Sequence, residues 1–350
     1  MRKKLFIFSF ILYVFYADAQ EMIVISDTTS ENYQKSQMSY NEGIQYFQNK
    51  QYQLAIDAYT QSIQLVGNFD KAYVNRANAY FELRDFKSAR NDLKMALELN
   101  PNNENAYQLR GDIYMAENKN DKAKKDYLKA VEINPNNAHC LYNLGVISFI
   151  EQDYPTAIEY FTKTIKVKSD HAYAYNDRAG AKRESGDLDG ALQDYNQAIK
   201  LDNKMAFAYN NRGTVKRRKG DFKGAIDDYT KAINLKSDYF IAYNNRGSAK
   251  FDSGDFEGAI ADFSQAIKLK SDYAFAYNNR AAAKFKLKDY RGSLADCNEA
   301  IKLDPNYGYA YLNRGTAREM LREFEKACQD WQKASELGVS NASKFLLDCN

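Results

Sequence analysis

An arginine recurs at a fixed spacing along most of this chain, and that period constrains the fold more than any other feature of the sequence. The recurring arginines are Arg76, Arg110, Arg178, Arg212, Arg246, Arg280 and Arg314. Glu42 and Leu144 occupy the two remaining positions of the same grid, so nine repeats of 34 residues tile residues 36–341 without insertion or deletion. Self-similarity at this period, with helical patterning inside each repeat, predicts a solenoid of stacked helical hairpins.

Small residues predict where the two helices of a repeat cross. The residue after the arginine position is always glycine or alanine, and twelve positions later stands an alanine or, once, a serine; Gly213 and Ala225 are one such pair. Because glycine in a helix costs about 1 kcal/mol relative to alanine, its repeated use indicates a close backbone contact. A polar turn such as Gly220-Asp221 lies between the two small residues, and an aromatic residue such as Tyr229 follows the second one. We therefore expect an antiparallel pair of helices in each repeat.

These residues resemble the tetratricopeptide repeat, which has the same 34-residue length and places bulky, small, aromatic and proline residues at the same offsets. One repeat carries most of the pattern in Tyr73, Ala77, Tyr80, Ala89, Leu93, Ala96 and Pro101. The resemblance implies an all-α fold, a right-handed α-solenoid (superhelix) of nine 34-residue helix-turn-helix repeats, with the first helices lining a concave face. The main departure is the arginine, which stands where the family usually has leucine.

Each arginine has an aspartate sixteen residues further along the chain. These aspartates are Asp92, Asp126, Asp194, Asp228, Asp262, Asp296 and Asp330. The two repeats that lack the arginine have Ala58 and Tyr160 at the aspartate position. An unpaired guanidinium between helices would cost several kcal/mol. If the two side chains are partners, the aspartate should therefore be present in every repeat that has the arginine and absent from every repeat that lacks it. We predict seven structural ion pairs, each within one repeat.

Two series of residues in the last five repeats fall on positions that, by the resemblance, face the concave groove. The first series is Tyr173, Phe207, Ile241, Phe275 and Tyr309, and the second is Asn176, Asn210, Asn244 and Asn278, followed by Leu312. Asparagine offers one acceptor and two donors to the backbone of an extended peptide, and aromatic side chains are frequent anchors at interfaces. Both series are therefore candidate partner-binding residues. The alternative is that the aromatic residues fill gaps between repeats and the asparagines cap exposed turns.

The N-terminal segment has the features of an export signal. Arg2, Lys3 and Lys4 precede an apolar run over residues 5–16, and Ala17-Asp18-Ala19 has the small-x-small pattern of a cleavage site. Because the apolar run is too short to span a bilayer, we expect residues 1–19 to be a cleaved signal peptide rather than an uncleaved anchor. Residues 20–35 are then a linker, and the protein is exported to the periplasm or the extracellular space without a membrane span.

The C-terminal residues 342–350 are expected to cap the open end of the solenoid. Cys349 ends a short helix-like tail, and Cys328 lies on the apolar side of the last repeat's second helix. An exported protein can oxidise its cysteines. A Cys328 to Cys349 disulfide that fastens the tail is one interpretation, and two unlinked small apolar side chains are the other.

The sequence offers no recognisable catalytic, cofactor or metal site. Its only histidines are His139 and His171, and no H-E-x-x-H, C-x-x-C or glycine-rich phosphate motif is present. A formal charge of only +3 argues against a nucleic-acid partner. We therefore expect a non-enzymatic scaffold that binds an extended segment of a protein or peptide in its groove, in an exported or envelope complex. The alternative is a self-associating architectural subunit, a homo-oligomer without a peptide ligand.

Overall fold

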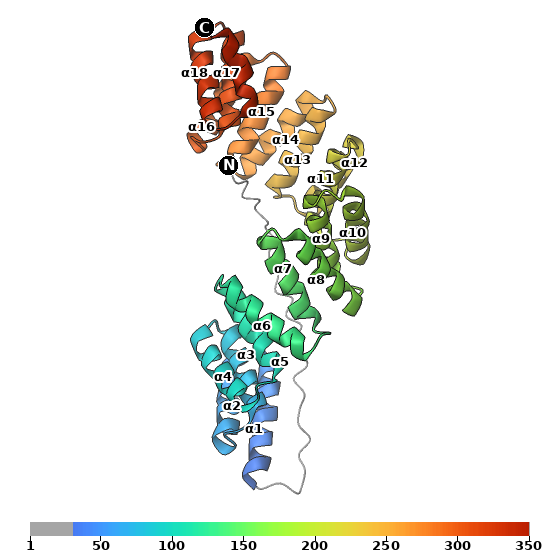
Figure 1. The fold of residues 1–350 in the computed structure, drawn as a ribbon, viewed down its shortest axis with the longest axis vertical. Helices are drawn as coiled ribbons and strands as arrows, with labels where there is room; N and C mark the ends of the chain where they lie inside the picture. Colours follow the sequence, from blue (N-terminus) through green and yellow to red (C-terminus); the bar gives the residue numbers. More distant parts are fainter. Residues whose placement is uncertain (1–30, 350) are drawn as a thin grey trace. The chain divides into compact units, whose positions relative to one another are not determined.

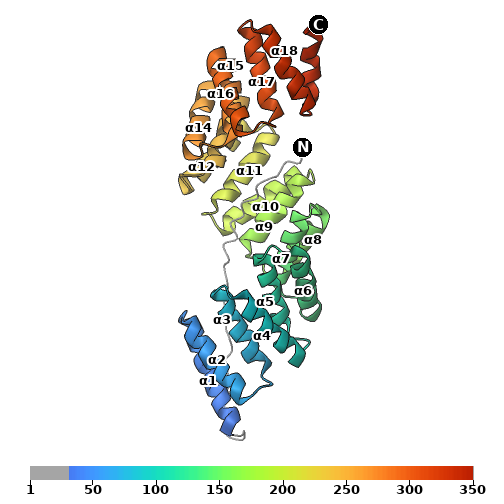
Figure 2. The same ribbon diagram turned by 90° about the vertical axis from the view of Figure 1, so that its left-hand side faces the viewer.

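The computed structural model describes residues 31–349, and all regular secondary structure within that range is helical (Figures 1 and 2). These residues form two compact units, an N-terminal unit of residues 31–169 and a C-terminal unit of residues 170–349. Within each unit, the tightest packing joins consecutive helices in pairs, α1 with α2, α3 with α4, and so on to α17 with α18. The expected all-α solenoid fold is confirmed in both units.

The helices of the N-terminal unit are α1 (Glu31–Gln48), α2 (Tyr52–Leu65), α3 (Asp70–Glu82), α4 (Phe86–Leu99), α5 (Glu104–Ala116), α6 (Asn120–Ile133), α7 (Ala138–Ile150) and α8 (Tyr154–Val167). Those of the C-terminal unit are α9 (Ala172–Glu184), α10 (Leu188–Leu201), α11 (Ala206–Arg218), α12 (Phe222–Leu235), α13 (Phe240–Asp252), α14 (Phe256–Leu269), α15 (Ala274–Lys286), α16 (Tyr290–Leu303), α17 (Gly308–Met320) and α18 (Phe324–Glu336), followed by the 3₁₀ helix η1 (Ser340–Asp348).

In three repeats, the turn between the two helices is built from a glycine with positive φ and a capping aspartate; these glycines are Gly186, Gly220 and Gly254. The other repeats have a non-glycine residue with positive φ at the same position. Gly220 follows α11 with a φ of +83°, a left-handed conformation that glycine adopts without steric cost. Asp221 precedes α12, and its carboxylate accepts the backbone N–H of Gly224 at 2.9 Å. The chain therefore reverses within the three residues between α11 and α12, and α12 begins with a capped N-terminus.

The small residues allow each pair of helices to approach closely, as predicted. A β-carbon added to Gly111 would lie 2.5 Å from the ring of Tyr127, and one added to Gly213 would lie 3.0 Å from the ring of Tyr229. Both rings are essentially inaccessible to solvent. A side chain at these glycine positions would thus displace the aromatic ring that fills the centre of the repeat.

All seven predicted arginine–aspartate pairs are present within their repeats. Arg212 is typical, because its Nε and Nη2 donate to the two carboxylate oxygens of Asp228 at 2.8 and 2.6 Å. This bidentate geometry is the strong form of the pair, and the carboxylate is almost fully buried. In the last five repeats a second cation joins each aspartate, such as Lys216 at 2.8 Å from Asp228.

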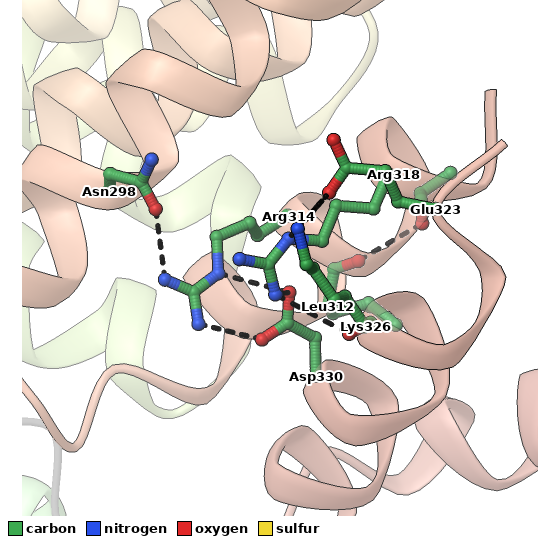
Figure 3. A network of polar contacts seen from close by, with 8 residues as sticks. Asn298, Leu312, Arg314, Arg318, Glu323, Lys326 and Asp330 are labelled. Atoms are coloured by element: carbon green, nitrogen blue, oxygen red, sulfur yellow. Dashed lines mark hydrogen bonds and ion pairs between the residues drawn. The ribbon is translucent and has the colours of Figure 1, made fainter. Parts of the chain in front are cut away.

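The arginines also connect neighbouring repeats, which the sequence did not predict. Nη1 of Arg212 donates to the side chain of Asn196 in the preceding repeat at 2.8 Å. Figure 3 shows the equivalent network in the last repeat, where Asp330 lies between Arg314 and Arg318 and Arg314 reaches back to Asn298. A guanidinium that makes all of these bonds holds three helices together.

The two ends of the repeat array differ in part from expectation. Helix α1 begins at Glu31, so residues 31–35 are helical rather than part of a linker. The expected signal peptide and residues 20–30 of the expected linker lie outside the described residues. At the other end, η1 packs on α18, with the rings of Trp331 and Phe345 stacked 5.1 Å apart.

The Cys328–Cys349 disulfide is present, with the two Cα atoms 5.7 Å apart, so the interpretation as two unlinked side chains is wrong. The bond closes a loop over a sequence separation of 21 residues. A loop of this length stabilises the folded chain by about 3 kcal/mol through the entropy that it removes from the unfolded state. The disulfide thus fastens the cap to the last repeat.

We expect Asp228→Ala to lower the free energy of unfolding by about 3 to 5 kcal/mol, because it leaves Arg212 and Lys216 without their shared carboxylate. Denaturant unfolding followed by circular dichroism measures the loss. Replacing Arg212, Lys216 and Asp228 together by leucine should cost much less, because no charge is left without a partner. Asp227→Ala, at the exposed neighbouring position, is the control and should change the stability by less than about 0.5 kcal/mol. Equal losses for the single and the triple replacement would contradict a compensated charge cluster.

Candidate partner-binding surface

The first helices of the C-terminal unit carry two parallel rows of side chains. The apolar row is Tyr173, Phe207, Ile241, Phe275 and Tyr309, as predicted, and one member lies on each of α9, α11, α13, α15 and α17. Four residues later on the last four of these helices stand Asn211, Asn245, Asn279 and Asn313, which we call the carboxamide row. Because residues four apart share one face of a helix, the two rows run side by side, one helical turn apart.

Asn176, Asn210, Asn244 and Asn278, the asparagines expected to face the groove, are instead buried. Between 5% and 7% of their surface is exposed. The carbonyl oxygens of Asn210, Asn244 and Asn278 accept hydrogen bonds of 2.9 to 3.0 Å from the carboxamide row of the following repeat. These side chains therefore join first helices, and neither peptide binding nor the capping of exposed turns describes them. The expectation was wrong by one residue, which corresponds to about 100° around a helix.

The carboxamide row is held in a fixed orientation by these bonds. Three members of this row each donate one N–H to the buried asparagine of the preceding repeat: Asn245, Asn279 and Asn313. Their side-chain carbonyl oxygens and second N–H groups have no hydrogen-bond partner within residues 31–349. All three side chains are partly exposed. One acceptor and one donor per repeat are thus available at a regular spacing.

The bonds between the buried asparagines and the carboxamide row form a ladder along the first helices. This ladder lacks its first step, between α9 and α11. Asn176 donates its side-chain N–H to Asp177 at 2.8 Å, and its carbonyl oxygen has no partner in the part of the chain that the structure describes. Asn211, the equivalent of Asn245, makes no bond to Asn176; its own carbonyl oxygen accepts a long contact of 3.5 Å from Asn210. Asn211 and Asn245 therefore differ in one buried hydrogen bond.

The apolar row continues into two tyrosines that were not among the predicted site residues. Tyr273 and Tyr307 directly precede α15 and α17, and Phe275 packs against both of them, with ring centroids 5.7 and 4.9 Å apart. Their recurrence at the repeat period was the available signal. Burial raises the pKa of Tyr273 to about 12, so its hydroxyl is neutral at physiological pH.

Exposure along the apolar row increases toward the end of the unit. Tyr173, Phe207 and Ile241 are half-buried, and the rings of Tyr173 and Phe207 lie 5.8 Å apart. Phe275 and Tyr309 are more exposed, at 52% and 56%. The aromatic residues therefore fill gaps between repeats, as the alternative interpretation held, and still present apolar area to solvent.

Chemically, the described residues offer few reactive groups. Residues 31–349 contain no group of three or more histidine, cysteine or acidic side chains that could hold a metal ion. The two free thiols, Cys140 and Cys297, are buried, and burial raises the pKa of Cys297 to about 12. Over the same range, no helix has both the length and the apolar character needed to cross a membrane.

Comparison with known families agrees with the repeat geometry. A family described as "TPR repeat" matches residues 111–149, 179–220, 213–251 and 247–288, and one described as "Tetratricopeptide repeat" matches residues 70–103 and 274–307. The chain belongs to the tetratricopeptide repeat family. Tetratricopeptide repeat folds are typically non-catalytic, and the chain is a scaffold for protein–protein interaction. Among curated proteins, no sequence matches it.

Solved tetratricopeptide repeat structures share the fold at low sequence identity. A tetratricopeptide repeat protein from Parabacteroides merdae has a TM-score of 0.57 and 19% identity, covering 69% of this chain and 97% of that one. The C-terminal part of a repeat protein from Cytophaga hutchinsonii has a TM-score of 0.55 and 18% identity, covering 69% and 98%. The APC/C hetero-tetramer Cut9-Hcn1 has a TM-score of 0.58 and 16% identity, covering 89% and 76%.

We expect Asn245→Ala to lower the free energy of unfolding by about 1 to 3 kcal/mol, because it leaves the buried carbonyl oxygen of Asn210 without its donor. Asn211→Ala is the matched control, since it removes the same side chain without breaking such a bond, and it should cost less than about 0.5 kcal/mol. Denaturant unfolding of the two variants measures the difference. Equal losses would show that the ladder contributes nothing to stability.

Proposed function

We propose that the C-terminal unit binds an extended segment of a partner protein along the first helices of its repeats. The observation that carries this proposal is the carboxamide row, in which Asn245, Asn279 and Asn313 are each held by one bond and keep one donor and one acceptor. An extended backbone also presents donors and acceptors at regular intervals. Side chains that are already oriented lose little conformational entropy when they bind it.

The apolar row supports the same proposal by offering anchoring sites for side chains of the segment. Phe275 and Tyr309 lie one helical turn from Asn279 and Asn313 on the same helices. Each exposes more than half of its surface. Burial of such rings is a frequent source of binding energy at interfaces, so the segment should carry apolar residues where it crosses α15 and α17.

Selection of random 12-residue peptides against the purified protein tests this proposal. We expect the protein to enrich peptides that share an apolar motif, and Phe275→Ser combined with Tyr309→Ser to weaken their binding at least tenfold in fluorescence anisotropy. Phe324→Ser is the matched control, because Phe324 is 54% exposed but begins a second helix, and it should leave binding unchanged. Failure to enrich any peptide, or equal binding by the double variant, would refute the proposal. If light scattering then shows oligomers that depend on concentration, the self-associating subunit becomes the better account.

We also propose that the protein acts outside the cytoplasm, in the periplasm or the extracellular space. The pattern of residues 1–19 and the Cys328–Cys349 disulfide both support export, since such bonds persist in oxidising compartments. We expect the intact mass of the protein purified from its native compartment to correspond to a chain that begins at Gln20 and carries one disulfide. A mass that includes Met1–Ala19, or free thiols at both cysteines, would contradict export.

A further inference from the structure

Five aromatic rings lie in contact with one another across the last three first helices of the C-terminal unit. They are Phe240 on α13, Tyr273 and Phe275 at the start of α15, and Tyr307 and Tyr309 at the start of α17. Their centroids follow one another at 5.1, 5.7, 4.9 and 6.5 Å. Neighbouring planes are tilted by 49° to 78°, so no ring covers the full face of the next one. We call these five rings the aromatic strip.

A lysine beside the aromatic strip is neutralised by an aspartate. The ammonium group of Lys270 lies 5.8 Å from the ring of Phe240, and it also pairs with Asp272 at 2.7 Å. Two members of the carboxamide row, Asn279 and Asn313, stand beside the strip on α15 and α17 and carry no charge. Partners tend to match the charge of the surface that they bind, so the strip and its amides favour an uncharged segment.

The first helices repeat the same pair of groups, one apolar side chain and one amide, at the distance between neighbouring helices. Bonds from Asn279 to Asn244 and from Asn313 to Asn278 hold α13, α15 and α17 side by side. Helices in direct contact lie about 8 to 10 Å apart. A β-strand returns the same face every two residues, over about 6.6 Å. A polyproline II helix returns the same face every three residues, over about 9.3 Å, so the period of the surface matches this conformation.

The groups of this surface also suit the backbone and the rings of a polyproline II helix. Such a helix makes no internal hydrogen bonds, so its carbonyl oxygens are free to accept. Asn279 and Asn313 each keep one side-chain N–H without a partner in residues 31–349, which supplies one donor per repeat. Proline-rich segments dock in grooves lined by aromatic side chains. Phe275 and Tyr309 expose more than half of their surface for such a contact.

We propose that the partner segment is proline-rich and binds the aromatic strip as a polyproline II helix, an inference that rests on the function proposed above. Residues three apart in the segment pack against Phe275 and Tyr309, and carbonyl oxygens between these contacts accept the free N–H groups of Asn279 and Asn313. A polyproline II helix is largely preformed in solution. It therefore loses little conformational entropy when it binds a row of amides that are already oriented.

Fluorescence anisotropy with three fluorescein-labelled 12-residue peptides tests the inference. The first peptide is four copies of Pro-Pro-Leu, which has both the polyproline II conformation and the three-residue period. The second has the same composition without the period, with four consecutive leucines between two blocks of four prolines. The third is four copies of Ser-Ser-Leu, which has the period without the conformation. We expect the first peptide to bind at least about tenfold more tightly than either of the others.

Two variants locate the binding site of the first peptide. Phe275→Ser combined with Tyr309→Ser should remove the difference between the peptides, because both exposed rings of the aromatic strip are lost. Phe324→Ser is the matched control, since Phe324 is equally exposed on a second helix, and it should keep the difference. Circular dichroism verifies folding of the variants, and Tyr309→Ser alone carries the test if the double variant fails to fold.

The possible outcomes separate this inference from the function on which it rests. Equal affinity for the first peptide and either of the other two would overturn the polyproline II segment. Binding that the double variant retains would place the peptide elsewhere and overturn it as well. If the selection of random peptides enriches apolar sequences without proline and the first peptide does not bind, the inference fails and the peptide-binding function stands. Recovery of no peptide, together with no binding of the three defined peptides, would refute both proposals.

Discussion

The structure depends on an arginine whose guanidinium donates hydrogen bonds both to its own repeat and to the preceding repeat. In most repeats where it occurs, the arginine makes two bonds to the aspartate of its own repeat and one to a polar side chain of the preceding repeat, as Arg246 does with Asp262 and Thr230. A cation held between helices is costly unless its donors are used, so this geometry converts a potential source of instability into a contact between three helices. Leucine at the same position could pack between helices but could not orient them.

The same charge network lies between the helices of the C-terminal unit, apart from the face that we propose for partner binding. The charges of the arginine, its aspartate and the accompanying lysine neutralise one another between helices. The tyrosine three residues before the arginine packs against the guanidinium, as Tyr243 does with its ring centroid 5.5 Å from Arg246. The first helices can then present amides and aromatic rings, whose binding is less sensitive to salt than that of charges.

Sequence patterns predicted the features that recur with a fixed partner. The match between each arginine and its aspartate, and the close approach of the helices at Gly213 and Ala225, could be derived because both members of a pair recur at the repeat period. The face of the asparagines could not be derived in the same way. Adjacent residues such as Asn244 and Asn245 are chemically identical, and which of them points inward depends on the rotation of the helix against its neighbour. The bond from Arg212 to Asn196 was missed for a related reason, because threonine, serine and asparagine share that position and no single residue type marks it.

The asparagine ladder makes the spacing of the exposed amides a property of the stacking itself. Since Asn279 is tied to Asn244 and Asn313 to Asn278, a change in the rotation between two repeats must move the exposed amide as well. A rigid ligand that binds the amides of several repeats would therefore fix the rotation between those repeats and resist bending of the unit. Occupancy of this surface and mechanical stiffness of helices α11 to α17 should therefore rise together.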